Sequence, residues 1–357
     1  MLDLKKKILV LAGAVMALSA CADKSGDISI LSDSDTFYQS ASVNNKIDIM
    51  WMVDSSGSMA PYQNNLSDNF ETFITDFVTK GYDYNIAVTA TDAWKYTQNP
   101  SNSWNQSLVR YRDGDIYDGL TGPNNSGIFM INLLTPNIVN NFKKNIKVGI
   151  NGDGDERGFQ SLRESFGATS INGGYNFKRS SAFLAVILVG DEEDSSRKSN
   201  GDAYSSTNEY KNAFVSYLDG YTGSTAGNRK YNVSTITVMD INNCPGHHAG
   251  ASQGNRFMSI ATATAGILGS ICDTNFSDSL EDIASRIVEL STRFKLSREP
   301  LPSSIVVKVN SVEIPQNATN GWVYIADSGS HYVEFRGTAT PQQGAAISVD
   351  FDPVSLE

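Results

Sequence analysis

Three oxygen-bearing side chains stand two residues apart, directly after an apolar run. Asp54, Ser56 and Ser58 follow residues 47–53, in which only Asp48 is polar. Such a run predicts a strand buried on both faces of a parallel sheet, and open α/β sheets bind ligands just beyond the carboxyl ends of their strands. A carboxylate and two hydroxyls are hard ligands that suit Mg²⁺, Mn²⁺ or Ca²⁺. The pattern predicts a divalent-cation site, the alternative being an ordinary Ser/Gly turn before a helix.

A second apolar run also ends in carboxylates. Residues 183–190 contain only apolar residues and one glycine, and Asp191 follows them. This composition predicts the most deeply buried strand of the chain. Residues 192–194 are three further acids. Because four neighbouring carboxylates repel one another without a cation among them, we expect Asp191 to share a metal ion with Asp54.

A third acidic segment lies between these two strands. Residues 147–166 predict a strand, a glycine-rich acidic loop and a helix, with Glu156 just before the helix. Asp153 and Asp155 of the same loop also resemble a fragment of a calcium-binding loop, without its full spacing. Glu156 is the candidate for a third carboxylate ligand.

The stretch Asp54-x-Ser56-x-Ser58 after an apolar strand resembles the metal-ion-dependent adhesion site of von Willebrand factor A (vWA) domains. The resemblance places Asp191 at the last acidic position of that motif, and Glu156 where the family has a Thr. It implies an ion held by Asp and Ser/Thr oxygens, partly through water, with one position open for an acidic side chain of a partner protein. The cofactor implied is Mg²⁺, or else Ca²⁺ or Mn²⁺.

Glu156 departs from the family pattern. If its carboxylate also ligates the ion, three carboxylates surround one divalent charge, and the attraction of the site for an acidic partner weakens. Two hypotheses follow: the metal is structural and the site is closed, or Glu156 moves away when the partner binds. A site with three carboxylates would favour Ca²⁺.

Strand and helix patterns alternate along residues 46–296, the part that the vWA resemblance covers. This alternation predicts an α/β fold with a doubly wound, mostly parallel sheet, vWA/Rossmann-like in type. From residue 297 to residue 357 the apolar residues recur with period two, which predicts a small C-terminal antiparallel β domain. Within the larger domain we expect further strands at 84–91, 233–239 and 267–272, and helices at about 61–80, 210–217 and 280–294.

Residues 1–21 run from three lysines through an apolar segment to Leu18-Ser19-Ala20-Cys21. This order is typical of a secretory signal peptide, and its last four residues resemble the lipobox of bacterial lipoproteins. The resemblance implies cleavage before Cys21, lipidation of Cys21 and anchoring in the outer membrane, facing the periplasm or the cell surface. The alternative is a plain cleaved signal with an incidental cysteine. Residues 22–45 are rich in Ser, Asp and Asn and are expected to form a tether.

Two cysteines remain, Cys244 and Cys272. Because an exported protein meets oxidising conditions, we expect them to form a disulfide. The competing hypothesis is a metal site, since His247 and His248 follow Cys244 closely. A disulfide would consume the thiolate that such a site needs.

Charge and composition restrict the partners. The formal net charge of −11 disfavours nucleic acid, because a nucleic-acid binder needs a basic face. Residues 93–128 form an expected insertion with aromatic side chains among Asn, Ser and Gly, a composition typical of recognition surfaces. The alternative is a decorated hairpin that packs its own aromatic residues.

The predicted function is metal-dependent protein binding by a lipoprotein of the cell envelope. The metal site and the 93–128 insertion would contact the partner. The alternative is a structural or assembly factor of the envelope with a closed metal site. We expect no enzyme, because neither a His-Glu-x-x-His motif nor a Walker loop occurs, and no base has a sequence signature near Ser56 or Ser58.

Overall fold

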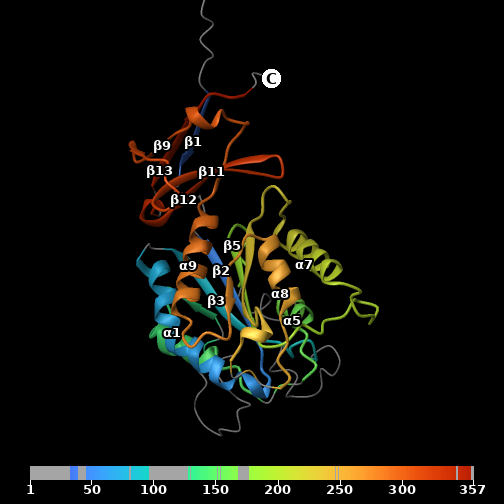
Figure 1. Cartoon of the computed structure of the whole chain (residues 1–357). Helices are drawn as coiled ribbons and strands as arrows, with labels where there is room; N and C mark the ends of the chain where they lie inside the picture. The colour runs from blue at the N-terminus through green and yellow to red at the C-terminus, as the bar shows by residue number, and fades with distance from the viewer. Residues whose placement is uncertain are drawn as a thin grey trace, which may run out of the picture. The chain divides into compact units, whose positions relative to one another are not determined.

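The computed structural model of the chain describes residues 33–38, 46–79, 82–95, 128, 130–150, 152, 154–167, 177–245, 247, 249–342 and 345–354 (Figure 1). All of them belong to one compact unit, Ser32–Glu357. The predicted signal peptide 1–21 with Cys21, most of the tether 22–45 and most of the insertion 93–128 lie outside the described residues. Among the described helices, none combines the length and the hydrophobicity that a membrane crossing needs.

A six-stranded sheet forms the centre of the larger domain (Figure 1). The strand order is β4-β3-β2-β5-β6-β7, and all neighbours are parallel except β3 and β4. The predicted α/β fold with a mostly parallel sheet is therefore confirmed. The strands are β2 (Lys46–Val53), β3 (Asp83–Ala90), β4 (Met130–Asn132), β5 (Phe183–Gly190), β6 (Tyr231–Thr237) and β7 (Leu268–Ser270).

The strand order reverses between β2 and β5. Strands β3 and β4 extend the sheet on one side of β2, and β5, β6 and β7 extend it on the other. In doubly wound sheets, ligands bind at the carboxyl ends of the two strands that flank such a reversal. Asp54 and Asp191 are the residues that follow these two strands.

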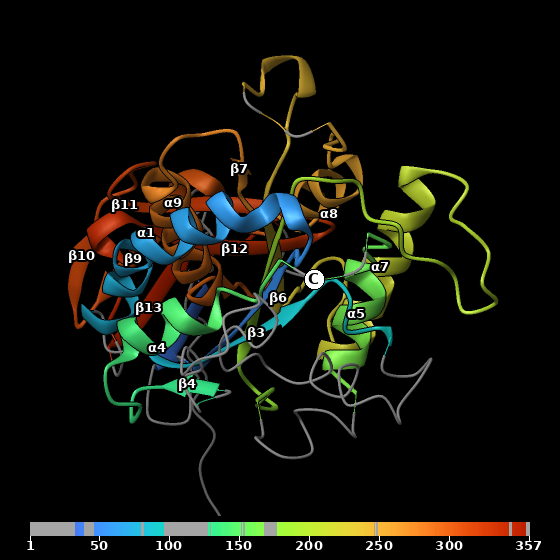
Figure 2. The same cartoon turned by 90° about the horizontal axis from the view of Figure 1, so that it is seen from below.

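Helices cover both faces of the sheet, as Figures 1 and 2 show. On β2, Ile47, Ile49 and Trp51 pack in one apolar cluster, and Met50 and Met52 pack in the other. Side chains of a strand alternate between the two faces of the sheet, so a strand between two helical layers is apolar nearly throughout. The first cluster contains residues of α1 (Ala60–Thr79), α4 (Ile138–Asn145) and α9 (Ser277–Ser291), and the second residues of α5 (Gly158–Ser165), α7 (Thr207–Thr222) and α8 (Asn255–Ala263).

Residues 147–150 do not form the strand that the sequence predicted. Val148 is fully buried, yet the segment has no strand structure. The edge of β3 that such a strand would need is already paired with the antiparallel strand β4. The apolar side chain of Val148 therefore enters the core from an irregular segment.

The C-terminal part forms two small antiparallel sheets, the first of them together with strand β1 (Asp33–Tyr38), and their orders are β1-β13-β9-β10 and β11-β12-β8. It begins at Phe294, slightly before the predicted boundary at residue 297, because β8 pairs with β12. Its apolar cluster includes Phe294, Val307, Trp322 and Phe335. The strands are β8 (Phe294–Lys295), β9 (Val306–Val309), β10 (Val312–Ile314), β11 (Gly321–Asp327), β12 (Ser330–Arg336) and β13 (Ala346–Phe351).

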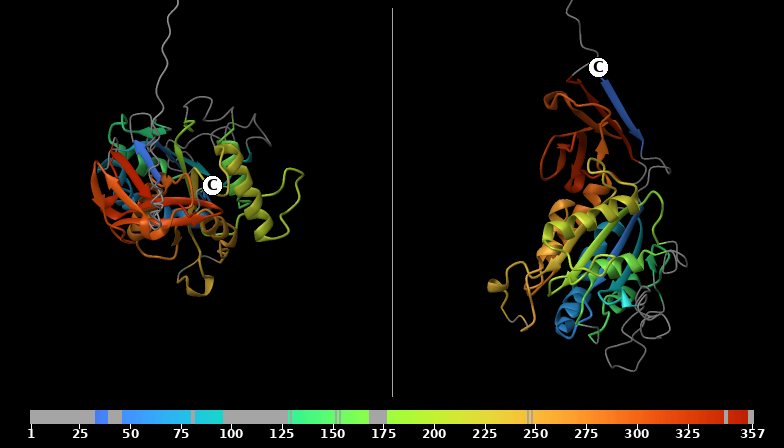
Figure 3. Two further views of the ribbon diagram at one scale, coloured as in Figure 1. Left: turned by 90° about the horizontal axis from the view of Figure 1, so that it is seen from above. Right: turned by 90° about the vertical axis from the view of Figure 1, so that its right-hand side faces the viewer.

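Part of the predicted tether is a strand. Residues 33–38 form β1 (Asp33–Tyr38), which pairs with β13 along its whole length (Figure 3). A sheet edge offers unpaired backbone N–H and C=O groups, and these can pair with an extended segment of almost any composition. The Ser- and Asp-rich composition of residues 22–45 therefore did not reveal this strand.

Candidate metal centre

Hydrogen bonds fix Asp54 at the end of β2 through both its backbone and its side chain. Its N–H donates to Val189 O of β5 over 2.8 Å, and its Oδ1 accepts from Ser56 N–H over 2.7 Å. Gln63 in α1 donates through Nε2 to Asp54 O at 2.9 Å and to Gly149 O at 2.8 Å. The Asp54 carboxyl group is fully buried. It therefore has one defined position.

Two hydroxyls connect the end of β2 to the end of β5. Ser56 Oγ and Ser58 Oγ are hydrogen-bonded at 3.0 Å, and Ser58 Oγ donates to Asp191 Oδ1 at 3.1 Å. Asp191 is fully buried and Ser56 nearly so. Ser58 belongs to the short 3₁₀ helix η1 (Gly57–Met59), which turns the chain from β2 into α1. The structure thus brings together four of the five predicted metal ligands.

Glu156, the fifth, reaches the same place from the loop before α5. Its backbone O accepts from Ser195 N–H at 2.8 Å, and its side chain is 6% exposed. Burial, together with the charge of Asp54 and a hydrogen bond to it, raises the pKa of Glu156 to about 11. Burial also raises the pKa of Asp54 to about 7, although hydrogen bonds to Glu156 and Ser56 act in the opposite direction. The two carboxyl groups therefore share a proton instead of both carrying charge.

Three carboxyl oxygens of this cluster are buried without a donor. Among the described residues, no backbone N–H, amide or hydroxyl group donates to Asp54 Oδ2, Glu156 Oε1 or Asp191 Oδ2, although Asp54 and Glu156 are hydrogen-bonded to each other through the proton that they share. Buried polar atoms normally have a partner, because leaving one without a hydrogen bond costs free energy. A divalent cation with a preference for oxygen, bound between Asp54 and Asp191, would satisfy the unpartnered oxygens of these two carboxylates.

The described residues contain no group of three or more His, Cys, Asp or Glu side chains close enough to hold a metal ion. A centre of the kind predicted needs fewer carboxylates, because the hydroxyls of Ser56 and Ser58 and water supply the other ligands. The donor types and the unpartnered oxygens fit a hard divalent ion. The residues that would hold it are Asp54, Ser56, Ser58 and Asp191, with Glu156 beside them.

Neighbouring loops fit closely around the centre. Gly152 N–H donates to Ser55 O at 2.8 Å, and a Cβ at residue 152 would lie 2.3 Å from Ser55 Oγ. Thr91 Oγ1 accepts from Ser55 N–H at 3.4 Å, and Thr91 O accepts from Arg157 N–H at 3.0 Å. Thr91, at the end of the strand expected at 84–91, therefore joins two loops beside the centre. Gln63 and Gly152 carry no sequence signal for their roles.

The acidic run after β5 is used differently from the prediction. Asp194 accepts from Phe159 N–H at 2.9 Å and from Ser196 N–H at 2.6 Å, so it caps the start of α5. Glu193 Oε1 accepts from Arg256 N–H at 3.0 Å. These two carboxylates have protein partners. Among the acids of this run, Asp191 is the one that hydrogen-bonds to a serine of the centre, Ser58. The repulsion among these acids is therefore smaller than the sequence suggested, because N–H donors offset part of the charge.

Asp153 lies outside the described residues. Asp155 pairs with an arginine and not with the residues of the metal centre. The Asp155 carboxylate forms an ion pair with Arg157, whose guanidinium stacks on the ring of Trp94 at 3.9 Å. Trp94 is 9% exposed and donates through Nε1 to Asp155 O. This aromatic residue of the predicted recognition surface is therefore packed. The other aromatic residues of the 93–128 insertion lie outside the described residues.

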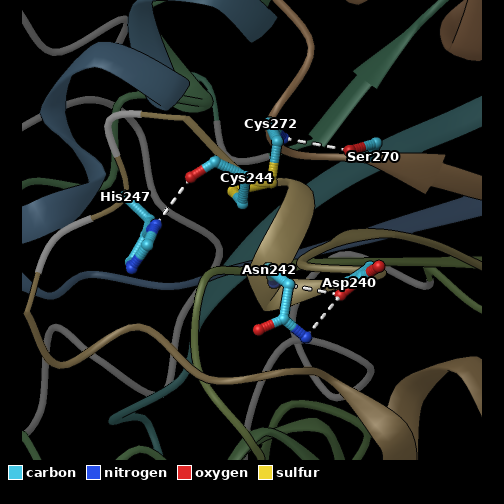
Figure 4. The surroundings of a disulfide bond; sticks show 6 residues. All are labelled: Asp240, Asn242, Cys244, His247, Ser270 and Cys272. Carbon is cyan, nitrogen blue, oxygen red and sulfur yellow. Dashed lines mark hydrogen bonds between the residues drawn. A yellow bond between two sulfur atoms is a disulfide. The ribbon is translucent and has the colours of Figure 1, made fainter.

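Cys244 and Cys272 form a disulfide with a Cα–Cα distance of 5.1 Å (Figure 4), the pairing expected from the sequence. His247 Nδ1 contacts Cys244 O at 2.6 Å. His248 lies outside the described residues. Because the disulfide consumes the thiolate, the competing metal site at Cys244 has lost its strongest ligand.

Residues 250–254 read Gly-Ala-Ser-Gln-Gly, the spacing of a hydrolase nucleophile elbow that the expectation of no enzyme overlooked. An elbow needs a strand directly before the serine, but here a loop lies between β6 and Ser252. Ser252 Oγ accepts from Glu193 N–H at 2.8 Å, and within the described residues no His side chain hydrogen-bonds to it. The segment does not have the geometry of a nucleophile elbow.

No family model matches the chain, and no curated protein matches it. Solved structures with similarity include proximal thread matrix protein 1 from the mussel byssus, with 13% identity and a TM-score of 0.37, covering 72% of this chain and 50% of that chain. The pilus adhesin SpaC from Lactobacillus rhamnosus GG has 11% identity and a TM-score of 0.39, covering 89% and 42%. The ArnB paralog VWA2 from Sulfolobus acidocaldarius has 11% identity and a TM-score of 0.33, covering 90% and 59%.

This chain thus spans about half the length of the first of these proteins and less than half of the second. At such identities and TM-scores, the similarities do not decide what this chain does.

Proposed function

We propose that this protein binds a protein partner through a divalent cation held by Asp54, Ser56, Ser58 and Asp191. The observation that carries the proposal is the set of three buried carboxyl oxygens without donors at the reversal point of the sheet. A bound Mg²⁺, Ca²⁺ or Mn²⁺ would supply a Lewis-acidic position for a carboxylate of the partner.

Each residue of the metal centre has a distinct role in this proposal. Asp54 and Asp191 supply the negative charge, and their positions are set by the hydrogen bonds that join β2 to β5. Ser56 and Ser58 supply neutral oxygens, which leave more of the positive charge of the ion available to an acidic partner. Glu156 competes for the same place as the carboxylate of the partner, so its displacement would accompany binding.

The proposal also includes the cellular setting implied by the sequence. Lipidation of Cys21 would anchor the protein in the bacterial outer membrane, facing the periplasm or the cell surface, and the 93–128 insertion would contact the partner beside the centre. Metabolic labelling with a radioactive fatty acid tests the anchor. We expect the label in the wild-type chain and its loss in Cys21→Ala.

A peptide pair tests the metal-mediated contact. Blocked Gly-Glu-Gly and Gly-Gln-Gly peptides have similar sizes and differ in one carboxylate. We expect the full-length chain in detergent to bind the Glu peptide in Mg²⁺, Mn²⁺ or Ca²⁺, and neither peptide in EDTA. Equal binding of the Glu peptide with and without metal would contradict the proposal.

A closed structural metal site in an assembly factor of the envelope is the second candidate function. The burial of Asp54, Asp191 and Glu156 favours it, because little surface is left for a partner. In that case a divalent ion would raise the melting temperature of the chain without promoting binding of the Glu peptide. We propose no catalytic role in either case, and a screen with generic ester and phosphate substrates tests this.

A further inference from the structure

A basic pocket of about 240 Å³ lies on the outer side of α5. Four of its lining residues are cationic and one is acidic, in a chain whose formal net charge is −11. The volume is below the usual range for a drug-sized ligand and suits a single side chain. Its lining includes Arg157, Gln160, Arg163, Glu164, Arg197 and Lys198.

The pocket is built by one helix face and one tight turn. Gln160, Arg163 and Glu164 are three and four residues apart, so they lie on the same face of α5. Gln160 N–H donates to Ser196 Oγ at 3.1 Å, and its Oε1 accepts from Arg197 N–H at 2.7 Å. These bonds join the turn to the helix and give the pocket fixed walls.

The turn needs a glycine. Gly201 has a φ of +89°, a conformation that side-chain-bearing residues rarely adopt, and its N–H donates to Lys198 O at 2.9 Å. Lys198 N–H donates in turn to Asp202 O at 2.9 Å. The turn therefore brings Arg197 and Lys198 back opposite α5.

Two of the four cations are already paired and two are not. Arg157 forms an ion pair with Asp155, and Lys198 Nζ lies 2.6 Å from Glu209 Oε1. In contrast, no carboxylate of the described residues forms an ion pair with Arg163 or Arg197. The guanidinium of Arg163 lies against the rings of Phe159 and Tyr217, and the guanidinium of Arg197 makes a 3.5 Å contact with Gly201 O through Nη1. The charge of Arg163 also acts on the carboxyl group of Glu164 in the same pocket, so an anion would share these two guanidinium groups with Glu164.

The pocket adjoins the metal centre. Arg157, in its wall, directly follows Glu156, which is hydrogen-bonded to Asp54. Ser195, which lies two residues before Arg197, donates its N–H to Glu156 O. The same two loops therefore form one side of the metal centre and one side of the pocket.

We propose that Arg163 and Arg197 bind a second acidic side chain of the same protein partner whose first carboxylate the metal ion would hold. This inference rests on the proposed function for the identity of the partner. A guanidinium binds a carboxylate through two parallel hydrogen bonds, and two such groups with no ion pair suit one carboxylate. The partner segment would then carry at least two acidic residues, and its binding would weaken at high salt.

Hexaglutamate is a suitable probe, because it presents six carboxylates along a chain that spans about 20 Å when extended. Its affinity for the full-length chain is measured in Mg²⁺ and in EDTA. Three proteins are compared: the wild type, the Arg163→Gln/Arg197→Gln variant and the Lys295→Gln/Arg298→Gln control. The control removes two exposed cations from the segment around β8, so the change in net charge is the same.

The Arg163→Gln/Arg197→Gln variant is expected to bind hexaglutamate about tenfold more weakly than the wild type, since exposed ion pairs contribute up to about 1 kcal/mol each. The control should bind as the wild type does. Equal affinity of the wild type and the Arg163→Gln/Arg197→Gln variant, with or without metal, would overturn the inference.

The two proposals can fail separately. If hexaglutamate binds equally in Mg²⁺ and in EDTA, and the loss in the Arg163→Gln/Arg197→Gln variant persists, the pocket stands and the metal-mediated function fails. If the single-carboxylate peptide needs metal while the variant keeps full affinity for hexaglutamate, the function stands and the pocket fails. Circular dichroism of each variant shows whether it has folded.

Discussion

At the scale of single residues, the metal centre is defined by what its carboxyl groups lack. Asp54 and Asp191 each have one oxygen with a donor and one without. Burial, and then the charge of Asp54, raise the pKa of Glu156 to about 11, which disfavours three negative charges in the centre without a cation. A divalent ion is the group that would reconcile this burial with ionised carboxylates.

Gly152 and Gly154 provide a matched test of the packing at the centre. A Cβ at residue 152 would lie 2.3 Å from Ser55 Oγ, whereas a Cβ at residue 154 would meet no atom within 4 Å. We expect Gly152→Ala to lower the free energy of unfolding by about 1–3 kcal/mol, the usual cost of overpacking. Gly154→Ala should change it little. Urea denaturation measures both, and equal effects would contradict the described packing.

At the scale of elements, α5 connects the metal centre to the basic pocket. Its start is fixed by Asp194, whose carboxylate accepts the N–H of Phe159, and Glu156 lies just before it. Gly158 packs against this carboxylate and Met52, and a Cβ there would lie 2.6 Å from Asp194 Oδ2. The position of Glu156 therefore depends on the cap of a neighbouring helix.

Removing that cap should destabilise the chain. Asp194→Ala deletes a buried acceptor of two N–H groups, and loss of a helix cap costs about 0.5–2 kcal/mol. We expect urea denaturation to show a loss near the upper end of that range, because both donors would be left buried. Asp202→Ala, at an exposed residue, serves as the control. If Asp194→Ala has the same free energy of unfolding as the wild type, the cap does not stabilise the fold as expected.

The elements differ in how far the sequence could predict them. Residues 47–53 and 183–190 were predictable as strands, because helices on both faces make a central strand apolar throughout. Strand β1 and the absence of a strand at 147–150 were not, because both depend on which sheet edges remain free. These pairings join residues far apart in the chain, so no local pattern records them.

The candidate site shows the same division. The Asp54-x-Ser56-x-Ser58 spacing is local, and the structure places those side chains with Asp191 as expected. The role of Asp194 as a helix cap and of Gln63 as a link between loops depends on contacts across the fold. The repulsion expected from the run of acids at 191–194 was overestimated, because Glu193 and Asp194 have N–H donors from other parts of the fold.

At the scale of the whole described molecule, one buried acid connects the last helix of the larger domain to the C-terminal sheets. Glu334 of β12 is fully buried. It accepts from Arg286 of α9 at 2.7 Å, and Arg293 and Arg336 also pair with it. Burial opposes its ionisation, but the three guanidinium groups outweigh burial and lower the pKa of Glu334.

This network predicts a pH-dependent stability. Because the pKa of Glu334 is lower in the folded chain than its ordinary value of 4.5, the stabilisation is complete above pH 4.5 and is lost as the pH falls through the folded pKa. Glu334→Gln should lower the free energy of unfolding by about 1.5–3 kcal/mol at pH 7, since it removes the charge-assisted hydrogen bonds that three half-buried guanidinium groups make to one buried carboxylate. The difference from the wild type should shrink towards pH 3.

Thermal unfolding between pH 3 and pH 7 measures this effect. Glu313→Gln, in the exposed strand β10, is the control and should follow the wild type at every pH. A constant difference between Glu334→Gln and the wild type across this range would show that the charge of Glu334 does not contribute.

The most direct test of the account is a calorimetric titration of the full-length chain in detergent with Mg²⁺, Mn²⁺ and Ca²⁺. Asp54→Asn keeps the shape of the side chain and removes its charge, and Asp68→Asn on the exposed side of α1 is the matched control. We predict saturable binding of at least one ion to the wild type and to Asp68→Asn, and none to Asp54→Asn. No saturable binding to any ion, or unchanged binding in Asp54→Asn, would contradict the metal centre.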